Sequence, residues 1–252
     1  MESAPCLVVE HVSRIFGGLK AVGGVSLTIR GGERRALIGP NGAGKTTLFN
    51  LISGELPVTA GTIRFFGSDV TRLAPYRRAA LGMARTFQIT RLFPNLSVLD
   101  NALLACEALD RRKFSMHRPL RTCAPIVERA AALIEEFTLG PVRHDLVRHL
   151  AYGEQRKLEV ALALAGRPRL LLLDEPMAGL SGGERESMRR LLDRLDPGMA
   201  VLLIEHDMDV AFALVETVTV LFQGTVLAEG LTNDIAANPQ VQQVYLGVPL
   251  VK

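Results

Sequence analysis

The sequence is poor in cysteine and aromatic residues and has no long hydrophobic run. It holds three cysteines and no tryptophan in 252 residues. Cys6, Cys106 and Cys123 form no CxxC pair and are odd in number, which favours a reducing compartment and argues against a cysteine metal site. No stretch reaches about 18 apolar residues, so we expect no segment that spans a membrane. If the protein works at a membrane, another chain must hold it there.

The charge is nearly balanced. Lys and Arg number 29 against 26 Asp and Glu, which gives a formal net charge of +3. So small an excess does not favour a nucleic-acid partner. The first residues show no basic stretch followed by an apolar one, so we expect no signal peptide. The apolar share of 48% suffices for a core, and the length allows one large domain or one domain with an inserted lobe.

What the sequence does contain is the glycine-rich pattern G-x-x-x-x-G-K-[ST]. The residues that form it are Gly39, Pro40, Asn41, Gly42, Ala43, Gly44, Lys45, Thr46 and Thr47. The apolar residues 36–38 before the pattern indicate a buried strand, and residues 48–52 after it indicate the start of a helix. This strand–loop–helix context predicts a P-loop rather than an incidental glycine-rich turn.

The chemistry of this loop follows from its backbone. Gly42 and Gly44 allow conformations that a side chain would block, so consecutive N–H groups turn inward and can bind an anion. The helix that begins at Lys45 points the positive end of its dipole at the same place. Lys45 adds a cation for the β- and γ-phosphates, and the Thr46 hydroxyl is placed to ligate Mg²⁺. The predicted cofactors are ATP and Mg²⁺.

Two further apolar runs end in polar residues, at the edge where open α/β sheets bind ligands. Residues 170–173 end in Asp174 and Glu175, and residues 201–204 lead to His206. Asp174 fits a Walker B aspartate, which helps to hold Mg²⁺. Glu175 can reach a water in line with the γ-phosphate and polarise it. The alternatives are a surface position for Glu175 and a structural role for His206.

The remaining β signals lie in the N-terminal third and near the end. Residues 25–29 alternate and residues 34–38 return after Gly31-Gly32, which predicts a hairpin that feeds the P-loop. Residues 62–66 predict another strand, and residues 218–229 predict a closing hairpin.

The middle of the chain is helical in pattern. Apolar residues at helical spacing over residues 125–137 predict an amphipathic helix. We therefore assign residues 1–88 and 151–252 to a catalytic core with a β part, and residues 89–150 to a helical lobe. A basic run over residues 111–121 is interpreted as a solvated loop, with contact to anionic lipid headgroups as the alternative.

In order and spacing, these motifs resemble those of ABC-transporter ATPase subunits over nearly the whole chain. The residues that carry the resemblance are Phe16, the P-loop, Gln88, residues 150–155, residues 173–176 and His206. The resemblance implies that Phe16 stacks on adenine. It also implies that Gln88 contacts Mg²⁺ and water from a Q-loop, and that His206 contacts the γ-phosphate.

The same resemblance implies a signature segment, which closes on ATP bound to the P-loop of a partner chain. Two segments are candidates. We assign the signature to residues 150–154, which precede Walker B and lead into a helix: Leu150, Ala151, Tyr152, Gly153 and Glu154. Residues 180–184 spell LSGGE, nearer to the usual LSGGQ, but follow Walker B, so we interpret them as a coincidence and Gly183 as part of an exposed turn. Ala151 replaces the usual serine, and Ser181 replaces the usual D-loop aspartate.

The fold that the resemblance implies is α/β, with a P-loop NTPase (RecA-like) core, an N-terminal antiparallel β part and an inserted helical lobe. The implied function is an ATPase that drives transport. Residues 85–88 with 91–93 close behind, 151–156, 205–209 and 245–247 resemble the larger ATPase of branched-chain (hydrophobic) amino-acid importers.

The implied partners are a second ATPase chain, two integral membrane permeases and, indirectly, a secreted solute-binding protein. The implied location is the cytoplasmic face of the cell membrane, as a peripheral subunit. Three alternatives remain open: an ABC ATPase for another solute or for lipid export, a soluble ABC ATPase of translation or DNA repair, and a P-loop kinase.

Overall fold

The computed structural model describes residues 4–86, 92–108 and 123–245. The chain forms two compact units. The first unit comprises the described residues up to Met83, residues Arg169–Glu175 and the described residues from Asp196 onward. The second unit comprises the described parts of Ala84–Pro168 together with Pro176–Leu195. Residues 151–168 and 176–195, which we assigned to the core from the sequence, belong to the second unit.

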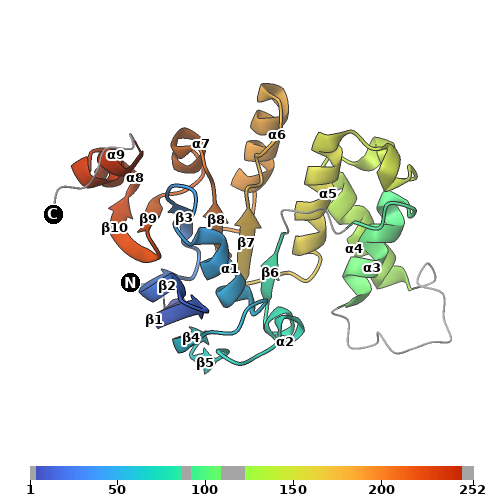
Figure 1. The fold of residues 1–252 in the computed structure, drawn as a ribbon. Helices are drawn as coiled ribbons and strands as arrows, with labels where there is room; N and C mark the ends of the chain where they lie inside the picture. Colours follow the sequence, from blue (N-terminus) through green and yellow to red (C-terminus); the bar gives the residue numbers. More distant parts are fainter. Residues whose placement is uncertain (1–3, 87–91, 109–122, 246–252) are drawn as a thin grey trace. The chain divides into compact units, whose positions relative to one another are not determined.

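One sheet of the first unit is antiparallel (Figure 1). Its strands, in spatial order, are β2 (Leu19–Arg30), β1 (Pro5–Phe16), β4 (Ala60–Phe65) and β5 (Ser68–Asp69). In β2 the side chains of Val25, Leu27 and Ile29 are buried, and those of the residues between them are exposed. The alternation predicted for residues 25–29 is therefore confirmed, because one face of the sheet packs on the core.

The second sheet is largely parallel. Its strands, in spatial order, are β10 (Thr225–Leu231), β9 (Thr217–Phe222), β3 (Arg34–Ile38), β8 (Ala200–Ile204), β7 (Leu170–Asp174) and β6 (Met83–Arg85). Every residue of β7 and β8 is buried, as expected for strands covered on both faces. β9 and β10 form the predicted closing hairpin.

The hairpin predicted for residues 25–38 is wrong. β2 pairs with β1 in the antiparallel sheet, whereas β3 pairs in parallel with β8 and β9. Gly31-Gly32 therefore carries the chain from one sheet to the other instead of turning it back on itself. The physical reason lies in burial: β2 has one exposed face, whereas four of the five residues of β3 are buried, so β3 needs neighbours that a hairpin partner cannot supply.

Helices complete both units. They are α1 (Lys45–Ser53), α2 (Pro75–Ala80), α3 (Val98–Ala108), α4 (Ala124–Glu136), α5 (Tyr152–Leu164), α6 (Gly182–Asp193), α7 (Met208–Phe212), α8 (Thr232–Ala236) and α9 (Pro239–Tyr245), with short 3-10 turns at Gly140–Val142 and Val147–His149. The main core of the first unit joins buried side chains of α1 to those of both sheets. In the second unit, α3, α4 and α5 pack against one another, and α4 confirms the helix predicted over residues 125–137.

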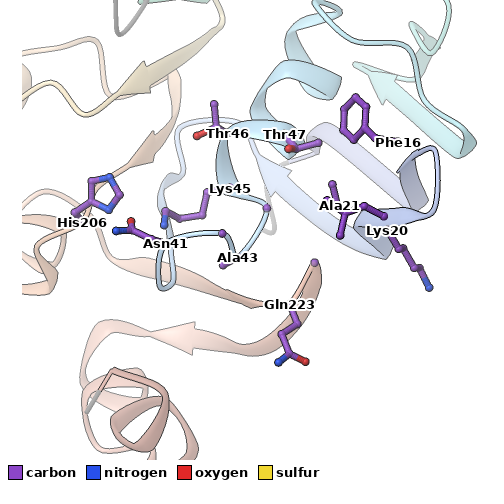
Figure 2. Close-up of a pocket in the computed structure, with 14 residues that line it drawn as sticks. Phe16, Lys20, Ala21, Asn41, Ala43, Lys45, Thr46, Thr47, His206 and Gln223 are labelled. Carbon is purple, nitrogen blue, oxygen red and sulfur yellow. The ribbon is translucent and has the colours of Figure 1, made fainter. Parts of the chain in front are cut away.

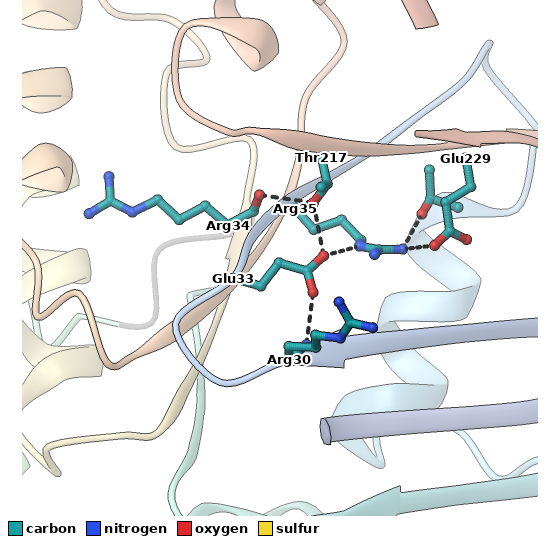
Figure 3. Close-up of polar contacts among 7 residues, drawn as sticks. Arg30, Glu33, Arg34, Arg35, Thr217 and Glu229 are labelled. Carbon is teal, nitrogen blue, oxygen red and sulfur yellow. Dashed lines mark hydrogen bonds and ion pairs between the residues drawn. The ribbon is translucent and has the colours of Figure 1, made fainter. Parts of the chain in front are cut away.

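Two buried arginines fix the elements that carry the P-loop. Arg35 on β3 is 6% exposed and binds Glu33, Glu229 and the Thr219 hydroxyl, which ties β3 to β9 and β10 (Figure 3). Arg78 on α2 is 2% exposed. Its guanidinium donates to four carbonyl oxygens, those of Leu51, Ile52, Leu73 and Thr71.

Two of those carbonyls belong to the last turn of α1, where helix carbonyls have no partner within the helix. A buried cation at this end also suits the helix dipole. Burial lowers the pKa of Arg78 to about 10, and the Asp69 carboxylate opposes that shift. Over residues 4–86, 92–108 and 123–245, no helix has both the length and the apolar character needed to cross a membrane.

Candidate functional site

The P-loop connects the end of β3 to the start of α1, as predicted. Gly39 has φ 147° and Gly44, the residue before α1, has φ 99°. A Cβ atom added to Gly39 would lie 2.2 Å from the backbone oxygen of Leu221, and one added to Gly44 would lie 2.5 Å from that of Ala21. Both positions therefore require glycine, because neighbouring backbone fills the space that a side chain needs. No acidic residue occupies the first turn of α1.

Lys45 lies across this loop. Its Nζ donates to the oxygens of Gly39, at 2.5 Å, and Pro40, at 3.1 Å. The residue is 5% exposed. Burial lowers the pKa of the Lys45 ammonium below its usual value, and the negative charge of Glu175 opposes that shift. The loop thus holds a nearly buried cation whose only bonded partners among the described residues are neutral carbonyls.

A pocket of about 570 Å³ opens over the loop. It is lined by Phe16, Leu19, Lys20, Ala21, Asn41, Gly42, Ala43, Gly44, Lys45, Thr46, Thr47, His206, Gln223 and Gly224. Figure 2 shows His206 on the side of the loop nearest Asn41 and Lys45, and Phe16 on the opposite side. The two side chains predicted from distant parts of the sequence therefore share one pocket with the P-loop.

The carboxyl ends of three parallel strands meet beside this pocket. The register places Leu37 of β3 opposite Ile204 of β8, and Ile204 opposite Asp174 of β7. Asp174 is 2% exposed. Glu175 follows with φ 49°, and its N–H donates to the Ile204 oxygen at 3.0 Å. A left-handed conformation at a non-glycine residue is costly and is typical of functional sites.

Glu175 and His206 form a pair. His206 Nε2 lies 2.5 Å from Glu175 Oε1. The Glu175 side chain is 11% exposed and that of His206 is 50% exposed. The pair therefore joins a carboxylate that is mostly shielded from water to an imidazole that can face a ligand in the pocket. The two residues come from the ends of adjacent strands, β7 and β8.

The predicted signature segment lies in the second unit, at the start of α5. Ala151 precedes the helix, and its N–H donates to Glu154 Oε2 at 2.9 Å. The Tyr152 hydroxyl donates to the Ala178 oxygen at 3.2 Å and accepts a bond from Arg156 Nε at 2.9 Å. Gly153 is buried. Ala151 has no side-chain oxygen, so the capping contact at this helix comes from Glu154 alone.

Some predicted site residues lie outside the described part of the chain, and some residues that line the pocket were not predicted. Gln88 lies outside the residues that the structure describes, as does the basic run at residues 111–121. Conversely, the pocket includes Leu19, Lys20, Ala21, Gln223 and Gly224, for which we predicted no role. The sequence marks Gln223-Gly224 only as the tip of a hairpin. Its contact with the P-loop, where the Gly224 N–H donates to the Ala43 oxygen at 3.0 Å, has no local sequence signal.

The side chains at the loop suit a magnesium–nucleotide ligand. Thr46 lines the pocket and Asp174 ends the strand beside it. Both offer oxygen donors, which Mg²⁺ prefers; this ion typically takes one or two protein ligands and keeps phosphate and water as the others. The glycine cradle and Lys45 suit the phosphates themselves.

Comparison with known proteins identifies the family of this chain. The model of the ABC transporter family matches residues 22–178. The chain belongs to the ABC transporter family. It is 38% identical over 252 residues to the high-affinity branched-chain amino acid transport ATP-binding protein BraF of Pseudomonas aeruginosa, covering 97% of this chain and 99% of the relative. The protein LivG of Salmonella typhimurium, which has the same description, is 39% identical over 252 residues, with coverage of 97% and 99%.

Solved structures of ATP-binding cassettes share the fold of this chain. The crystal structure of the ADP conformation of MJ1267, an ATP-binding cassette of an ABC transporter, matches with a TM-score of 0.86 at 28% identity, covering 97% of this chain and 100% of that chain. A nucleotide-free ATP-binding cassette matches with a TM-score of 0.83 at 27% identity, covering 96% and 99%. The predicted fold class, a P-loop NTPase core with an antiparallel β part and a helical region, is confirmed.

Proposed function

We propose that this chain is the ATP-binding subunit of an ABC importer and hydrolyses MgATP to drive uptake of branched-chain or other hydrophobic amino acids. The observation that carries the chemistry is that Lys45 and His206 line one pocket while Glu175 contacts His206 and acts electrostatically on Lys45. The solute class is supported by the near full-length likeness to BraF and LivG, whose descriptions specify branched-chain amino acid transport.

In this proposal the P-loop holds the triphosphate. The N–H groups of residues 42–47 and the dipole of α1 face the β- and γ-phosphates. Lys45 exchanges its present carbonyl partners for phosphate oxygens, which offer a charge-assisted bond in place of a neutral one. Phe16, 42% exposed at the pocket, stacks on the adenine.

Thr46 and Asp174 are the proposed protein contacts of Mg²⁺, with Gln88 as a third on the strength of the resemblance alone. The metal would neutralise part of the charge on the β- and γ-phosphate oxygens. Its ligand set is oxygen-only, in keeping with a hard divalent cation.

Glu175 is the proposed general base. A water in line with the γ-phosphate gives a proton to the Glu175 carboxylate while its oxygen attacks phosphorus. The bond from the γ-phosphorus to the bridging oxygen breaks, and ADP and phosphate result. His206, whose Nε2 is 2.5 Å from Glu175 Oε1, fixes the carboxylate and offers its exposed ring to a γ-phosphate oxygen.

The signature segment of one chain, Ala151–Glu154, is proposed to close on ATP bound to the P-loop of a second ATPase chain. That second chain is either identical or related. Permeases in the membrane would pass the conformational change to the solute, and the chain itself would act at the cytoplasmic face. These partners are proposed because the relatives are described as transport ATP-binding proteins.

Uptake by cells tests the proposal. A strain lacking this chain should lose high-affinity uptake of radiolabelled leucine or a related apolar amino acid. The wild-type gene should restore it, and a Lys45→Ala gene should not. Uptake of a charged amino acid serves as the control and should not change. Unchanged uptake of every apolar amino acid would reject the solute class while leaving the ATPase proposal to be judged by hydrolysis.

A further inference from the structure

The ring of Phe16 has a cationic neighbour. The guanidinium carbon of Arg14 lies 4.5 Å from the centroid of the Phe16 ring. Phe16 is the last residue of β1 and is 42% exposed. An arginine at this distance over an aromatic face is a cation–π contact. Both residues belong to the first compact unit.

Arg14 is itself held in place. Its Nη1 donates to the Pro57 oxygen at 2.9 Å. The flanking backbone is bound to the same segment, because the Ile15 N–H donates to Thr59 Oγ1 at 3.2 Å and the Thr59 N–H donates to the Ser13 oxygen at 2.8 Å. Residues 57–59 lie in the segment that follows α1, so this segment holds the end of β1 that carries Phe16.

The Arg14 guanidinium contacts the Phe16 ring but does not itself line the pocket. Phe16 lines the pocket and remains 42% exposed, so part of its ring is open to a ligand. A half-exposed phenylalanine without such a neighbour would lose rotamer freedom when a base stacks on it, and that loss weakens binding.

We propose that Arg14 is a positioning residue for the nucleobase: it fixes the Phe16 ring so that the part of the ring open to the pocket is ready to stack on a purine. This inference rests on the proposed nucleotide function and deepens it. The expected arrangement is a layered stack of guanidinium, phenyl ring and purine. Because Arg14 is not among the described residues that line the P-loop pocket, we expect it to affect binding of the base and not binding of the phosphates.

The test is a double-mutant cycle with two ligands. Arg14→Met, Phe16→Leu and the double variant are titrated with MgATP and with magnesium tripolyphosphate, which has the phosphates but no base. Arg14→Met should weaken MgATP binding about three- to fivefold, the range expected for immobilising one more side chain on binding, and leave tripolyphosphate affinity unchanged. KM for ATP should rise by the same factor while kcat stays within about twofold.

The double variant tests whether Arg14 acts through the Phe16 ring. In the Phe16→Leu background, Arg14→Met should have no further effect on MgATP, because the ring through which Arg14 acts is gone. Arg14→Lys keeps a cation and should lose less than Arg14→Met; it also carries the test if the methionine variant does not fold. Arg64→Met is the matched control, since Arg64 lies on β4 of the same sheet and contacts Glu10 at 3.8 Å.

Two results would overturn the inference. An equal loss for MgATP and tripolyphosphate would mean that Arg14 acts on the phosphate end or on the fold. The same loss in the Phe16→Leu background would mean that the arginine does not act through the ring. By contrast, a wild-type chain that binds neither ligand would reject the proposed function itself, and the inference with it.

Discussion

The starts of α1 and α5 are both predicted to contact phosphate, but the two helix N-termini differ in charge. At α1 the first turn has no acid, and Lys45 adds a nearly buried cation. At α5 the first turn contains Glu154, whose carboxylate accepts the Ala151 N–H. Glu184 lies close to Gly153: a Cβ atom at this glycine would be 2.3 Å from Glu184 Oε1.

The difference shows that glycine and a helix dipole do not by themselves make a phosphate site. The start of α1 is ready for an anion because loop geometry, dipole and cation agree. The start of α5 already has carboxylates as neighbours. The Ser181 hydroxyl and N–H, together with the Gly153 N–H, hold the pKa of Glu184 below its usual value, so it is charged at neutral pH. At the proposed signature segment, a γ-phosphate would therefore compete with a carboxylate of the same chain.

A third helix start, at α6, sharpens the comparison. The segment LSGGE at residues 180–184 leads into α6, so Gly183 is exposed as expected but lies in the first turn of a helix. Glu184 Oε2 accepts the Ser181 N–H at 2.9 Å and the Ser181 hydroxyl at 2.6 Å. The likeness to a signature motif thus has a local cause: serine and a glutamate three residues later make a helix N-cap. Leading into a helix does not distinguish the two candidates.

The largest effect is expected for Lys45→Ala. Removing the cation should weaken MgATP binding at least about a hundredfold, since bonds to charged groups contribute about 1.5–3 kcal/mol each. Hydrolysis should fall below detection. Isothermal titration of the purified chain measures the binding. Lys157→Ala makes the same charge change on α5 in the other unit and should bind MgATP as the wild type does. Near wild-type affinity in Lys45→Ala would reject the P-loop as the phosphate site.

Gly153→Asp should impair ATPase activity of the assembled complex far more than Gly183→Asp, by about tenfold or more. Both variants add a carboxylate to the first turn of a helix, but Gly183 has nothing within 4 Å of an added Cβ, whereas Gly153 has Glu184. Adding Glu184→Ala to Gly153→Asp removes that neighbour. Stability should then recover in part, because Glu184→Ala relieves the clash but also removes the α6 cap, while activity stays low. Equal losses in the two single variants, with both folded, would reject residues 150–154 as the signature.

Arg78→Met tests the far end of α1. It should lower the free energy of unfolding by about 3 kcal/mol, because carbonyls that this arginine satisfies would be left buried without a donor. Arg77→Met is the neighbouring control. Arg77 stacks on the exposed Tyr76 ring at 5.9 Å, and its loss should cost no more than about 0.5 kcal/mol. Urea unfolding measures both. Similar values for the two variants would show that Arg78 does not support α1.

The smallest effect is expected for Glu33, which bonds to Arg35 of β3 and to Thr217 of β9. Burial opposes its ionisation, but bonds from the Arg30 N–H, Arg35 and Thr217 outweigh burial and lower its pKa. A lowered pKa in the folded state adds stability above the unfolded value and loses it as pH falls through the folded value. Glu33→Gln should therefore be less stable by about 1 kcal/mol at pH 7. The gap should close from about pH 5 downward. A gap that does not depend on pH would contradict this origin.

Sequence patterns predicted the elements that depend on local signals. The P-loop with α1, the buried strands β7 and β8, and the amphipathic α4 are examples. The sheet to which β3 belongs could not be predicted from local signals, because it depends on pairing with distant strands. Gly31-Gly32 has the same chemistry in a hairpin and in a passage between sheets, and only the distant partners of β3, on β8 and β9, separate the two.

The site residues also divide into those that local sequence signals predict and those that depend on tertiary contacts. Lys45, Asp174, Glu175 and His206 follow strands, so their position at one edge of a sheet could be predicted. The fully buried Arg78 could not, since arginine is usually exposed and its carbonyl partners come from distant residues. The pocket residues at the start of β2 and in the β9–β10 turn are also set by tertiary contacts. The roles of the signature segment and of Gln88 stay predictions.

The measurement that tests the central claim most directly is MgATP turnover and chain association in Glu175→Gln. The amide keeps the size of the side chain but cannot accept the proton of the attacking water. Hydrolysis should fall by about 10²–10⁴-fold, while the P-loop still binds MgATP. Size-exclusion chromatography with MgATP, and with the partner ATPase where one is needed, should show two chains held together with trapped nucleotide. Hydrolysis at the wild-type rate would contradict the account, because the carboxylate beside His206 would then have no part in catalysis.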